Sequence, residues 1–415
     1  MIERRLIDVA LEKTQDTPVL LLEGPRTSGK STILRQLSVR LSGHLLDLDD
    51  LDTRAAAVDD PATMIDGPGP LLIDEYQHAP ELLDAIKARL NQSSTPGQFI
   101  LAGSARHQSL PRTAQALTGR LRRLPVLPLA QSEIEGSRPQ MLSRILTDTA
   151  SIVSPKESET SRADYIGRAV RGGFPLSLAA RSDNSRYAWI DDYVRLTLER
   201  DVQELSRLRQ ARVLPDLLSR LAGQTAQVLN SARVAEAVRV DERTARDYVR
   251  LLEAVFMVHL LPGWDRTLTK RTTVRPKVHL VDSAVAARLL RLTPDKLARR
   301  DAASLTQFGY LLETFVVGEL LKEASWTDSV AGTGHWRTKD GDEVDLVAET
   351  YDGGVAGFEI KAASRVFARD FRSLERLRSI MGDAFTAGVV FYTGARSYNY
   401  SDRLYVVPID RLWVD

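Results

Sequence analysis

The chain has 415 residues, of which 43% are hydrophobic and 27% charged, and its formal net charge is +1. A chain of this size and composition is expected to fold into about two to four domains, each with its own core. The near-zero charge excludes a uniformly basic protein, so any nucleic-acid surface must come from local patches.

The absence of cysteine excludes disulfides and thiolate metal sites and fits a reducing compartment. The N-terminal segment MIERRLIDVALEKTQ is too charged for a signal peptide. No apolar run approaches the ~20 residues of a membrane span. We therefore expect a cytoplasmic protein without a membrane segment.

The first strong motif lies within VLLLEGPRTSGKSTILRQL, where an apolar strand leads into a glycine-rich loop and then a helical pattern. This is the context that a P-loop requires. In such a loop Lys30 reaches the β and γ phosphates and Ser31 binds Mg²⁺. We expect ATP to contact the whole loop, namely Gly24, Pro25, Arg26, Thr27, Ser28, Gly29, Lys30, Ser31 and Thr32.

A second apolar strand, in GPGPLLIDEYQHAPELL, ends in two carboxylates. We expect Asp74 to hold the magnesium ion through water and Glu75 to act as the general base on the attacking water. The alternative is an acidic pair that is simply solvated. A further strand candidate at 44–50 lies between the two motifs, an arrangement typical of AAA+ and related ATPases and not of kinases or simple GTPases.

The segments GPRTSGKST, IDEYQ, LAGSAR, LTGRLRRLPVLPLAQSE and RGGFP, in this order, resemble a family of bacterial and archaeal AAA+-type ATPases over nearly the whole chain. The resemblance implies a parallel α/β core that hydrolyses ATP as a homo-oligomer. It also implies that Ser104 senses the γ phosphate. An arginine from a neighbouring subunit commonly completes such a site, and Arg120 and Arg106 are the candidates. The alternative for either arginine is an ordinary ion pair with a surface carboxylate.

Residues 136–213 are predicted to form a connector followed by helices. The segment SPKESETSR has little periodicity and indicates a mobile stretch at 154–161. The following segments RGGFPLSLAA and YAWIDDYVRLTLERDVQELSRL have the apolar spacing of packed helices. Arg200 and Asp201 are candidates for a contact with nucleotide or a partner; the alternative, and the more common role, is an ion pair at the surface or between helices.

Residues 214–290 have the order helix, turn, helix and two strands, which is typical of a winged helix-turn-helix. Ser231 and Asp241 are the expected caps of the two helices. Basic residues are concentrated on the second helix and on the segment between the strands, at Arg243, Arg246, Arg250, Arg266, Lys270, Arg271, Arg275 and Lys277.

The first three of these arginines recur at i, i+3 and i+7 and therefore share one helix face. We expect a DNA-binding patch that contacts phosphates, with Arg243, Arg246, Arg250, Lys270 and Arg271 as its main residues. The alternative is a protein contact, because winged helices also serve as lids and protein-binding modules in ATPases of this class.

From residue 300 to 415 the predicted order is helix, β-hairpin, strand, helix and two strands. This order resembles the restriction-endonuclease-like PD-(D/E)xK fold. The resemblance places Asp345 on the second strand, and Glu359 and Lys361 on the third, at the positions of that family's site residues.

Glu359 and Lys361 are two residues apart and so share one face of a strand, while Ile360 points into the core. Asp345 and Glu359 are expected to hold Mg²⁺ or Mn²⁺, with Glu313 as a further ligand and Lys361 as the group that acts on water. The pattern fits an active or ancestral nuclease site, or a fold kept as a binding module.

The sequence therefore predicts an α/β protein with an AAA+-like P-loop ATPase core at 1–135, a connector and helical segment at 136–213, a winged helix at 214–290 and a PD-(D/E)xK-like domain at 300–415. The expected function is Mg²⁺-dependent ATP hydrolysis that remodels or processes DNA. The alternative is an ATP-controlled switch, in which the winged helix and an inactive nuclease-like domain recognise protein or DNA.

Overall fold

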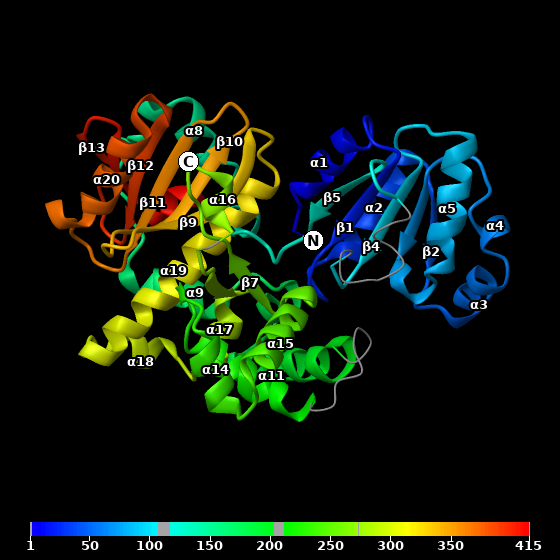
Figure 1. Ribbon diagram of the computed structural model, residues 1–415, viewed down its shortest axis with the longest axis horizontal. Coiled ribbons are helices and arrows are strands. Elements are labelled where there is room, and N and C mark those ends of the chain that lie inside the picture. Colours follow the sequence, from blue (N-terminus) through cyan, green and yellow to red (C-terminus); the bar gives the residue numbers. More distant parts are fainter. Residues whose placement is uncertain (1, 107–116, 203–210, 273, 415) are drawn as a thin grey trace.

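The computed structural model describes residues 2–106, 117–202, 211–272 and 274–414 (Figure 1). Its N-terminal part is a parallel five-stranded sheet with the order β2-β3-β4-β1-β5. The strands are β1 (Val19–Glu23), β2 (His44–Asp47), β3 (Leu71–Asp74), β4 (Phe99–Gly103) and β5 (Leu121–Pro125). The helices around it are α1 (Leu6–Lys13), α2 (Lys30–Leu41), α3 (Leu51–Asp59), α4 (Pro61–Met64) and α5 (Glu81–Gln92).

Both faces of this sheet are covered, which is why its central strands read as continuous apolar runs. Leu20 and Leu22 of β1 pack with α1 and α2 on one face. Val19 and Leu21, one residue out of step, pack with α5 on the other. The result is a three-layer α/β domain whose strands all end at the same edge.

The connector and helical segment contains α7 (Gln131–Glu135), α8 (Met141–Thr147), α9 (Arg162–Arg171), α10 (Pro175–Leu178), α11 (Asp183–Leu196) and a π-helical turn (Thr197–Asp201). The prediction of a mobile stretch at 154–161 is wrong. Ser158 and Thr160 both donate hydrogen bonds to Asp410 near the C-terminus, at 2.5 and 2.8 Å. The polar composition serves these contacts and not a free linker.

The next unit contains α13 (Leu214–Ala222), β6 (Gln227–Val228), α14 (Ser231–Val238), α15 (Glu242–Ala254), β7 (Val258–Leu261), α16 (Leu268–Arg271) and β8 (Lys277–Leu280), followed by α17 (Ser283–Leu289) and α18 (Pro294–Ala298). We call residues 214–290 the middle unit. Its strands form an antiparallel sheet with the order β6-β8-β7.

The helix caps of the middle unit agree with the prediction at one of two positions. Asp241 caps α15 by accepting a hydrogen bond from the backbone N–H of Thr244 at 2.9 Å. The cap of α14 is Asn230 and not Ser231, because the Asn230 side chain accepts from the backbone N–H of Arg233. Ser231 donates to Glu242 instead.

The C-terminal part begins with the long helix α19 (Ala302–Ser325) and continues with β9 (Val330–Arg337), β10 (Glu343–Thr350), β11 (Val355–Lys361), α20 (Arg372–Met381), β12 (Phe385–Tyr392), β13 (Tyr398–Ser401) and β14 (Leu404–Pro408). The strands form one mixed sheet with the order β13-β14-β12-β11-β10-β9. The predicted order of elements is present, with β13 as an additional strand. Most of β13 is exposed, so it lacks the apolar pattern by which strands are recognised.

Figure 1 shows the N-terminal sheet as one lobe and the C-terminal sheet as another, with the helices of the middle of the chain below the latter. One hydrophobic core continues from the connector through the middle unit into the C-terminal sheet. Trp413 illustrates this continuity, because its ring packs against Tyr165 of α9 and Phe315 of α19. Across the described ranges, no helix has the length and apolar character needed to span a membrane.

Candidate nucleotide site and a second charged cluster

The glycine-rich loop lies at the carboxyl edge of the N-terminal sheet, between β1 and α2. Gly29 has a φ of +99°, a conformation that glycine adopts without steric cost. Gly24 passes so close to Val126 that an added Cβ would lie 2.1 Å from its carbonyl oxygen. Both glycines are therefore required by the backbone of the loop.

Lys30, the first residue of α2, is buried at the centre of the loop. Its ammonium group donates to the carbonyl oxygens of Gly24 at 3.0 Å and Pro25 at 2.8 Å. Burial lowers the pKa of Lys30 to about 8, against the opposing effect of Glu75 and Asp74. A phosphate anion in the loop would supply further negative charge and favour the ammonium form.

The two predicted magnesium ligands meet at this edge. The Ser31 hydroxyl is hydrogen-bonded to the carboxylate of Asp74, at the end of β3. Burial raises the pKa of Asp74, and the bond from Ser31 opposes that rise. A hydroxyl and a carboxylate are hard oxygen ligands of the kind that Mg²⁺ takes beside phosphate, so both residues fit this ion.

Glu75 lies beside the residues expected to surround the γ phosphate. Ser104, just past the end of β4, donates to the carboxylate of Glu75 at 3.1 Å. Gln77 donates to the same carboxylate oxygen and lies 3.2 Å from the Ser104 hydroxyl. The structure therefore brings together the predicted base and the predicted γ-phosphate sensor. Gln77 was not predicted, although it stands in the quoted segment IDEYQ.

The helical segment reaches the loop through Asp201. This buried carboxylate, in the π-helical turn after α11, lies 2.6 Å from the guanidinium of Arg26 in the loop. Arg200 and Asp201 line a cavity of about 750 Å³ together with Arg26, Gln77 and Ser104. Asp201 thus takes part in an ion pair, the more common of the roles considered, and its partner lies in the P-loop; a contact with nucleotide stays a prediction.

The second residue that the sequence analysis missed is Arg4. Its buried guanidinium donates to the carbonyl oxygens of Ser28 at 2.7 Å and Leu127 at 2.8 Å, and to the carboxylate of Glu133 at 3.0 Å. Arg4 thereby supports the P-loop from outside. No local pattern around it could have indicated this, because its partners lie 24 to 129 residues away in the chain.

The two candidate arginines lie in different places. Arg120 directly precedes β5 and so lies at the edge of the parallel sheet opposite the loop of its own chain, where it donates to Asn91. Arg106 is bound to the end of α15: its backbone and side chain donate to the carbonyl oxygens of Ala254 and Glu253, and its guanidinium lies over Phe256. Within the chain, Arg106 joins the N-terminal lobe to the middle unit.

The predicted DNA patch is only partly available at the surface. Arg243, Arg246 and Arg250 are exposed on α15, and Lys270 is exposed on α16. The prediction for Arg271 is wrong, because its guanidinium makes a bidentate ion pair with Glu349 of β10, at 2.7 and 2.9 Å.

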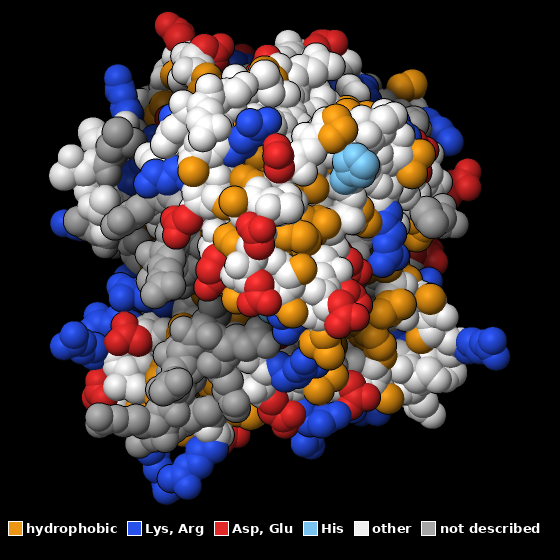
Figure 2. All heavy atoms as spheres, turned by 90° about the vertical axis from the view of Figure 1, so that its right-hand side faces the viewer, with side chains coloured by type: hydrophobic (Ala, Val, Ile, Leu, Met, Phe, Trp, Pro, Cys, Tyr) orange, Lys and Arg blue, Asp and Glu red, His pale blue; other side chains and the backbone are white. Residues whose placement is uncertain are grey.

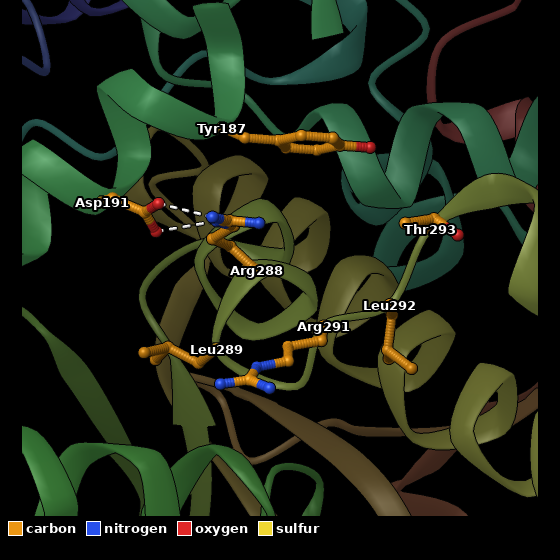
Figure 3. Close-up of a pocket in the computed structure, with 7 residues that line it drawn as sticks. All are labelled: Tyr187, Asp191, Arg288, Leu289, Arg291, Leu292 and Thr293. Carbon is orange, nitrogen blue, oxygen red and sulfur yellow. Dashed lines mark hydrogen bonds and ion pairs between the residues drawn. The ribbon is translucent and has the colours of Figure 1, made fainter. Parts of the chain in front are cut away.

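Two other surfaces offer no competing site of this kind. The described part of the face of the N-terminal lobe in Figure 2 shows acidic side chains across its middle, with apolar ones among them, and no basic patch there. The cavity in Figure 3, of about 350 Å³, lies where α11 faces the end of α17. Its Arg288 is already paired with Asp191 through two hydrogen bonds and lies over the ring of Tyr187.

In the C-terminal domain, the predicted metal ligands surround a lysine. Lys277 of β8, expected on the exposed wing, is instead 1% exposed. Its ammonium nitrogen lies 2.8 Å from Glu313, 2.6 Å from Glu343 and 3.0 Å from Asp345. Glu359 is paired with Lys361 at 2.7 Å.

The carboxylates of Glu313, Asp345 and Glu359 are therefore paired with lysine ammonium groups, and a metal site at these residues stays a prediction. Among the residues that the structure describes, no group of three or more histidines, aspartates or glutamates is placed to hold a metal ion. The residues do converge, as their spacing predicted, but the ammonium of Lys277 lies between the carboxylates of Glu313 and Asp345. The neighbouring strand β11 also holds Asp345, through a hydrogen bond that the backbone N–H of Ile360 donates to its carboxylate.

The charges of this cluster influence each other strongly. Burial by itself would lower the pKa of Lys277, but Asp345, Glu313 and Glu343 outweigh it and raise that pKa well above the usual value. Burial, together with Asp345, raises the pKa of Glu359 to about 8 against the effect of Lys361. Lys277 is thus a permanent cation among carboxylates that are partly neutralised.

Three family models match successive parts of the chain. Residues 16–135 match the AAA domain, residues 162–296 a domain of unknown function, DUF8612, and residues 308–412 a domain of unknown function, DUF4143. The proteins called Rv2008c in Mycobacterium tuberculosis and Mb2031c in Mycobacterium bovis are each 28% identical to the chain over 416 residues, which covers 99% of this chain and 85% of theirs.

Similar solved structures include the Walker-type ATPase PABY2304 of Pyrococcus abyssi, with a TM-score of 0.43 and 16% identity over 70% of this chain and 96% of that one. DnaA from Aquifex aeolicus, bound to AMPPCP, gives a TM-score of 0.25 and 16% identity over 60% of this chain and 86% of that one. The match at 16–135 coincides with the parallel sheet and its P-loop. The N-terminal lobe therefore matches the AAA domain over these residues and has a parallel sheet with a P-loop.

Proposed function

We propose that the chain is a Mg²⁺-dependent ATPase that binds DNA and acts as a homo-oligomer, with the nucleotide controlling the position of the DNA-binding unit. The observation that carries this proposal is the contact between Arg26 of the P-loop and Asp201 of the helical segment. Nucleotide in the loop would lie beside this ion pair. Hydrolysis or release of the nucleotide would change the charge beside Arg26 and thereby affect its ion pair with the helical segment.

The path continues into the middle unit by two contacts. Arg106, just past β4, is bound to the end of α15. The second contact starts from α11, the helix that the π-helical turn follows, where the ring of Tyr193 packs against Phe174. The neighbouring backbone N–H of Gly173 donates to the carboxylate of Asp282, just after β8. The middle unit therefore contacts both the end of β4 and the helical segment that holds Arg26.

We assign the middle unit to the winged helix-turn-helix class. The order of α13, β6, α14, α15, β7 and β8 and the sheet order β6-β8-β7 support this assignment. In such units the second helix of the helix-turn-helix enters the major groove. That helix is α15 here, and its three exposed arginines would contact phosphates. Several acidic residues lie among them, which favours moderate affinity without sequence recognition.

Assembly into an oligomer is supported by the position of Arg120. A residue at the opposite edge of the sheet from its own P-loop cannot complete the site of its own chain. We propose that a ring of subunits would bring this edge of the sheet to the nucleotide of a neighbour. We propose Arg120, and not the internally bound Arg106, for this role.

The DNA-binding part of the proposal predicts a change in salt dependence. Replacing Arg243, Arg246 and Arg250 by alanine in one variant should weaken DNA binding. Each phosphate contact that is lost means that binding releases about one counterion fewer from the DNA. The slope of log K against log salt concentration should flatten by up to about 0.9 for each contact. Fluorescence anisotropy of a labelled duplex at several salt concentrations measures both quantities.

A matched control replaces three exposed basic residues elsewhere, Lys87, Arg181 and Arg376, with alanine. This variant should keep the slope of the wild-type protein. An unchanged slope in the α15 variant would assign this face to a protein partner.

The route from nucleotide to DNA is tested by replacing Asp201 with asparagine, which removes the charge that holds Arg26. We expect basal ATP hydrolysis to persist and its stimulation by DNA to disappear. Couplings between sites usually amount to about 5- to 150-fold. Steady-state hydrolysis is to be measured without DNA and with linear, branched and single-stranded DNA. Asp192→Asn, in an exposed ion pair of α11, is the control. Equal stimulation of Asp201→Asn and wild type would show that the signal takes another route.

A further inference from the structure

Lys277 links two parts of the molecule that are far apart in sequence. It is the first residue of β8 in the middle unit, whereas its partners belong to α19 and β10 of the C-terminal domain. An ammonium group has three N–H donors, and three carboxylates lie within 3.0 Å of this one. The donors and acceptors are thus matched in number.

The charges of the surrounding cluster are nearly balanced. Four carboxylates, Glu313, Glu343, Asp345 and Glu359, lie around the cations Lys277, Lys361 and Arg337, so that the formal charge of the cluster with every group ionised is −1. Without Lys277 the same formal charge is −2. A divalent cation would therefore find its counter-charge only after this lysine had left.

Lys277 is also held firmly where it is. Its strand pairs with both β6 and β7 in the middle sheet, and Leu261 is its direct partner on β7. The same region of the middle unit is joined to β10 by the ion pair of Arg271 with Glu349. Withdrawing the ammonium would thus require separating the middle unit from the C-terminal sheet or leaving buried carboxylates without a partner, and both are unfavourable.

We propose that Lys277 is a built-in cation that takes the place of the divalent metal in the nuclease-like fold, so that the C-terminal domain is a binding module joined to the middle unit and not a metal-dependent nuclease. The neighbouring pair of Glu359 and Lys361 agrees with this, because the lysine expected to act on water is bound to a carboxylate expected to bind metal. The inference deepens the function proposed above and does not depend on ATP hydrolysis.

The first test uses the wild-type protein without nucleotide. We expect that Mn²⁺ neither raises its melting temperature nor binds at Asp345, as counted by the loss of the free-ion signal in electron paramagnetic resonance. We also expect no nicking of supercoiled DNA with Mg²⁺ or Mn²⁺. One Mn²⁺ per chain that is lost in Asp345→Asn, or nicking that is lost in the same variant, would overturn the inference. The Asp345→Asn comparison separates this site from Ser31 and Asp74.

The second test replaces Lys277 with methionine, which keeps most of the volume and removes the charge. The melting temperature should fall without metal and should rise again when Mn²⁺ is added. Lys339→Met, on the exposed turn between β9 and β10, should show neither effect. A folded Lys277→Met protein that gains no stability from Mn²⁺ would contradict the inference. If this variant does not fold, Lys277→Met combined with Glu343→Gln leaves one carboxylate fewer and gives the same test.

Because the function of the ATPase domain is measured separately, the two proposals can fail independently. A wild-type protein that does not hydrolyse ATP would refute the proposed ATPase activity and leave the result of the metal titration unaffected. Metal binding at Asp345 would refute the built-in cation and leave ATP turnover unaffected.

Discussion

Replacing Lys30 with alanine is expected to abolish ATP binding. The ammonium group of Lys30 donates to two loop carbonyls, and the P-loop motif predicts that it reaches the β and γ phosphates of bound ATP. Hydrogen bonds between charged groups are worth about 1.5–3 kcal/mol each, so the loss of two such contacts should weaken affinity by at least about 100-fold. Titration with a fluorescent ATP analogue measures this affinity.

The matched control is Lys87→Ala, which removes an exposed lysine from α5 of the same domain. Its affinity for ATP should equal that of the wild-type protein. The melting temperatures of both variants show whether either has lost its fold. A folded Lys30→Ala protein with unchanged affinity would mean that ATP binds elsewhere.

Replacing Glu75 with glutamine is expected to stop hydrolysis while ATP binding remains. Glutamine has nearly the same shape and can still accept the hydrogen bond that Ser104 donates to Glu75. It cannot take a proton from water at neutral pH. General-base catalysis typically contributes about 10²- to 10⁴-fold, so turnover should fall by a factor in this range. Steady-state phosphate release, with ATP affinity measured in parallel, tests both parts.

Glu12→Gln, an exposed glutamate of α1, serves as the control and should keep normal turnover. Equal turnover in Glu75→Gln and wild type would remove Glu75 from the mechanism. Asp74 would then be the remaining carboxylate at the end of β3. A fall in affinity together with turnover would instead indicate that Glu75 supports binding.

The N-terminal fold was predictable because its signals are local. An apolar strand, a glycine-rich loop and a helix follow each other without a gap, and the loop needs glycine at Gly24 and Gly29 for reasons of backbone geometry. The strand that ends in Asp74 is equally continuous. Parallel strands bring their carboxyl ends to one edge, so the meeting of Ser31, Asp74 and Ser104 follows from the order of the elements.

The contacts that the sequence analysis missed are those between distant segments. Arg4 and Lys277 have nothing in their neighbourhood that distinguishes them from surface residues, and the sequence singled out Asp201 without indicating its partner Arg26. Lys277 follows a run of basic residues, and this context favoured an exposed wing. Its actual position depends on how β8 lies against the C-terminal sheet, which no periodicity along the chain determines.

The C-terminal cluster shows the limit of arguing from spacing alone. The pattern of Asp345, Glu359 and Lys361 correctly placed these side chains close to each other. It could not reveal a fourth participant from a separate unit, and that participant carries the charge which the pattern assigned to a metal ion. Convergence of carboxylates is thus compatible with a metal or with an ammonium group, and only the fold distinguishes them.

The helical segment contacts the predicted nucleotide loop through one ion pair. Its π-helical turn places Asp201 against Arg26, and such turns are frequent at functional sites. An ion pair with one partner in the P-loop is sensitive to the charge of the bound phosphates. The central claim is therefore that the nucleotide state changes the affinity for DNA, and by linkage DNA must change the affinity for nucleotide equally.

The measurement that tests this claim most directly is the DNA affinity of the Glu75→Gln protein with and without ATP and Mg²⁺, because this variant holds ATP without consuming it. We expect the two dissociation constants to differ by at least about fivefold, the lower end of usual couplings between sites. The same comparison in Glu75→Gln combined with Asp201→Asn should give equal values. Equal affinities in the single variant, at saturating ATP, would contradict nucleotide control of the DNA-binding unit.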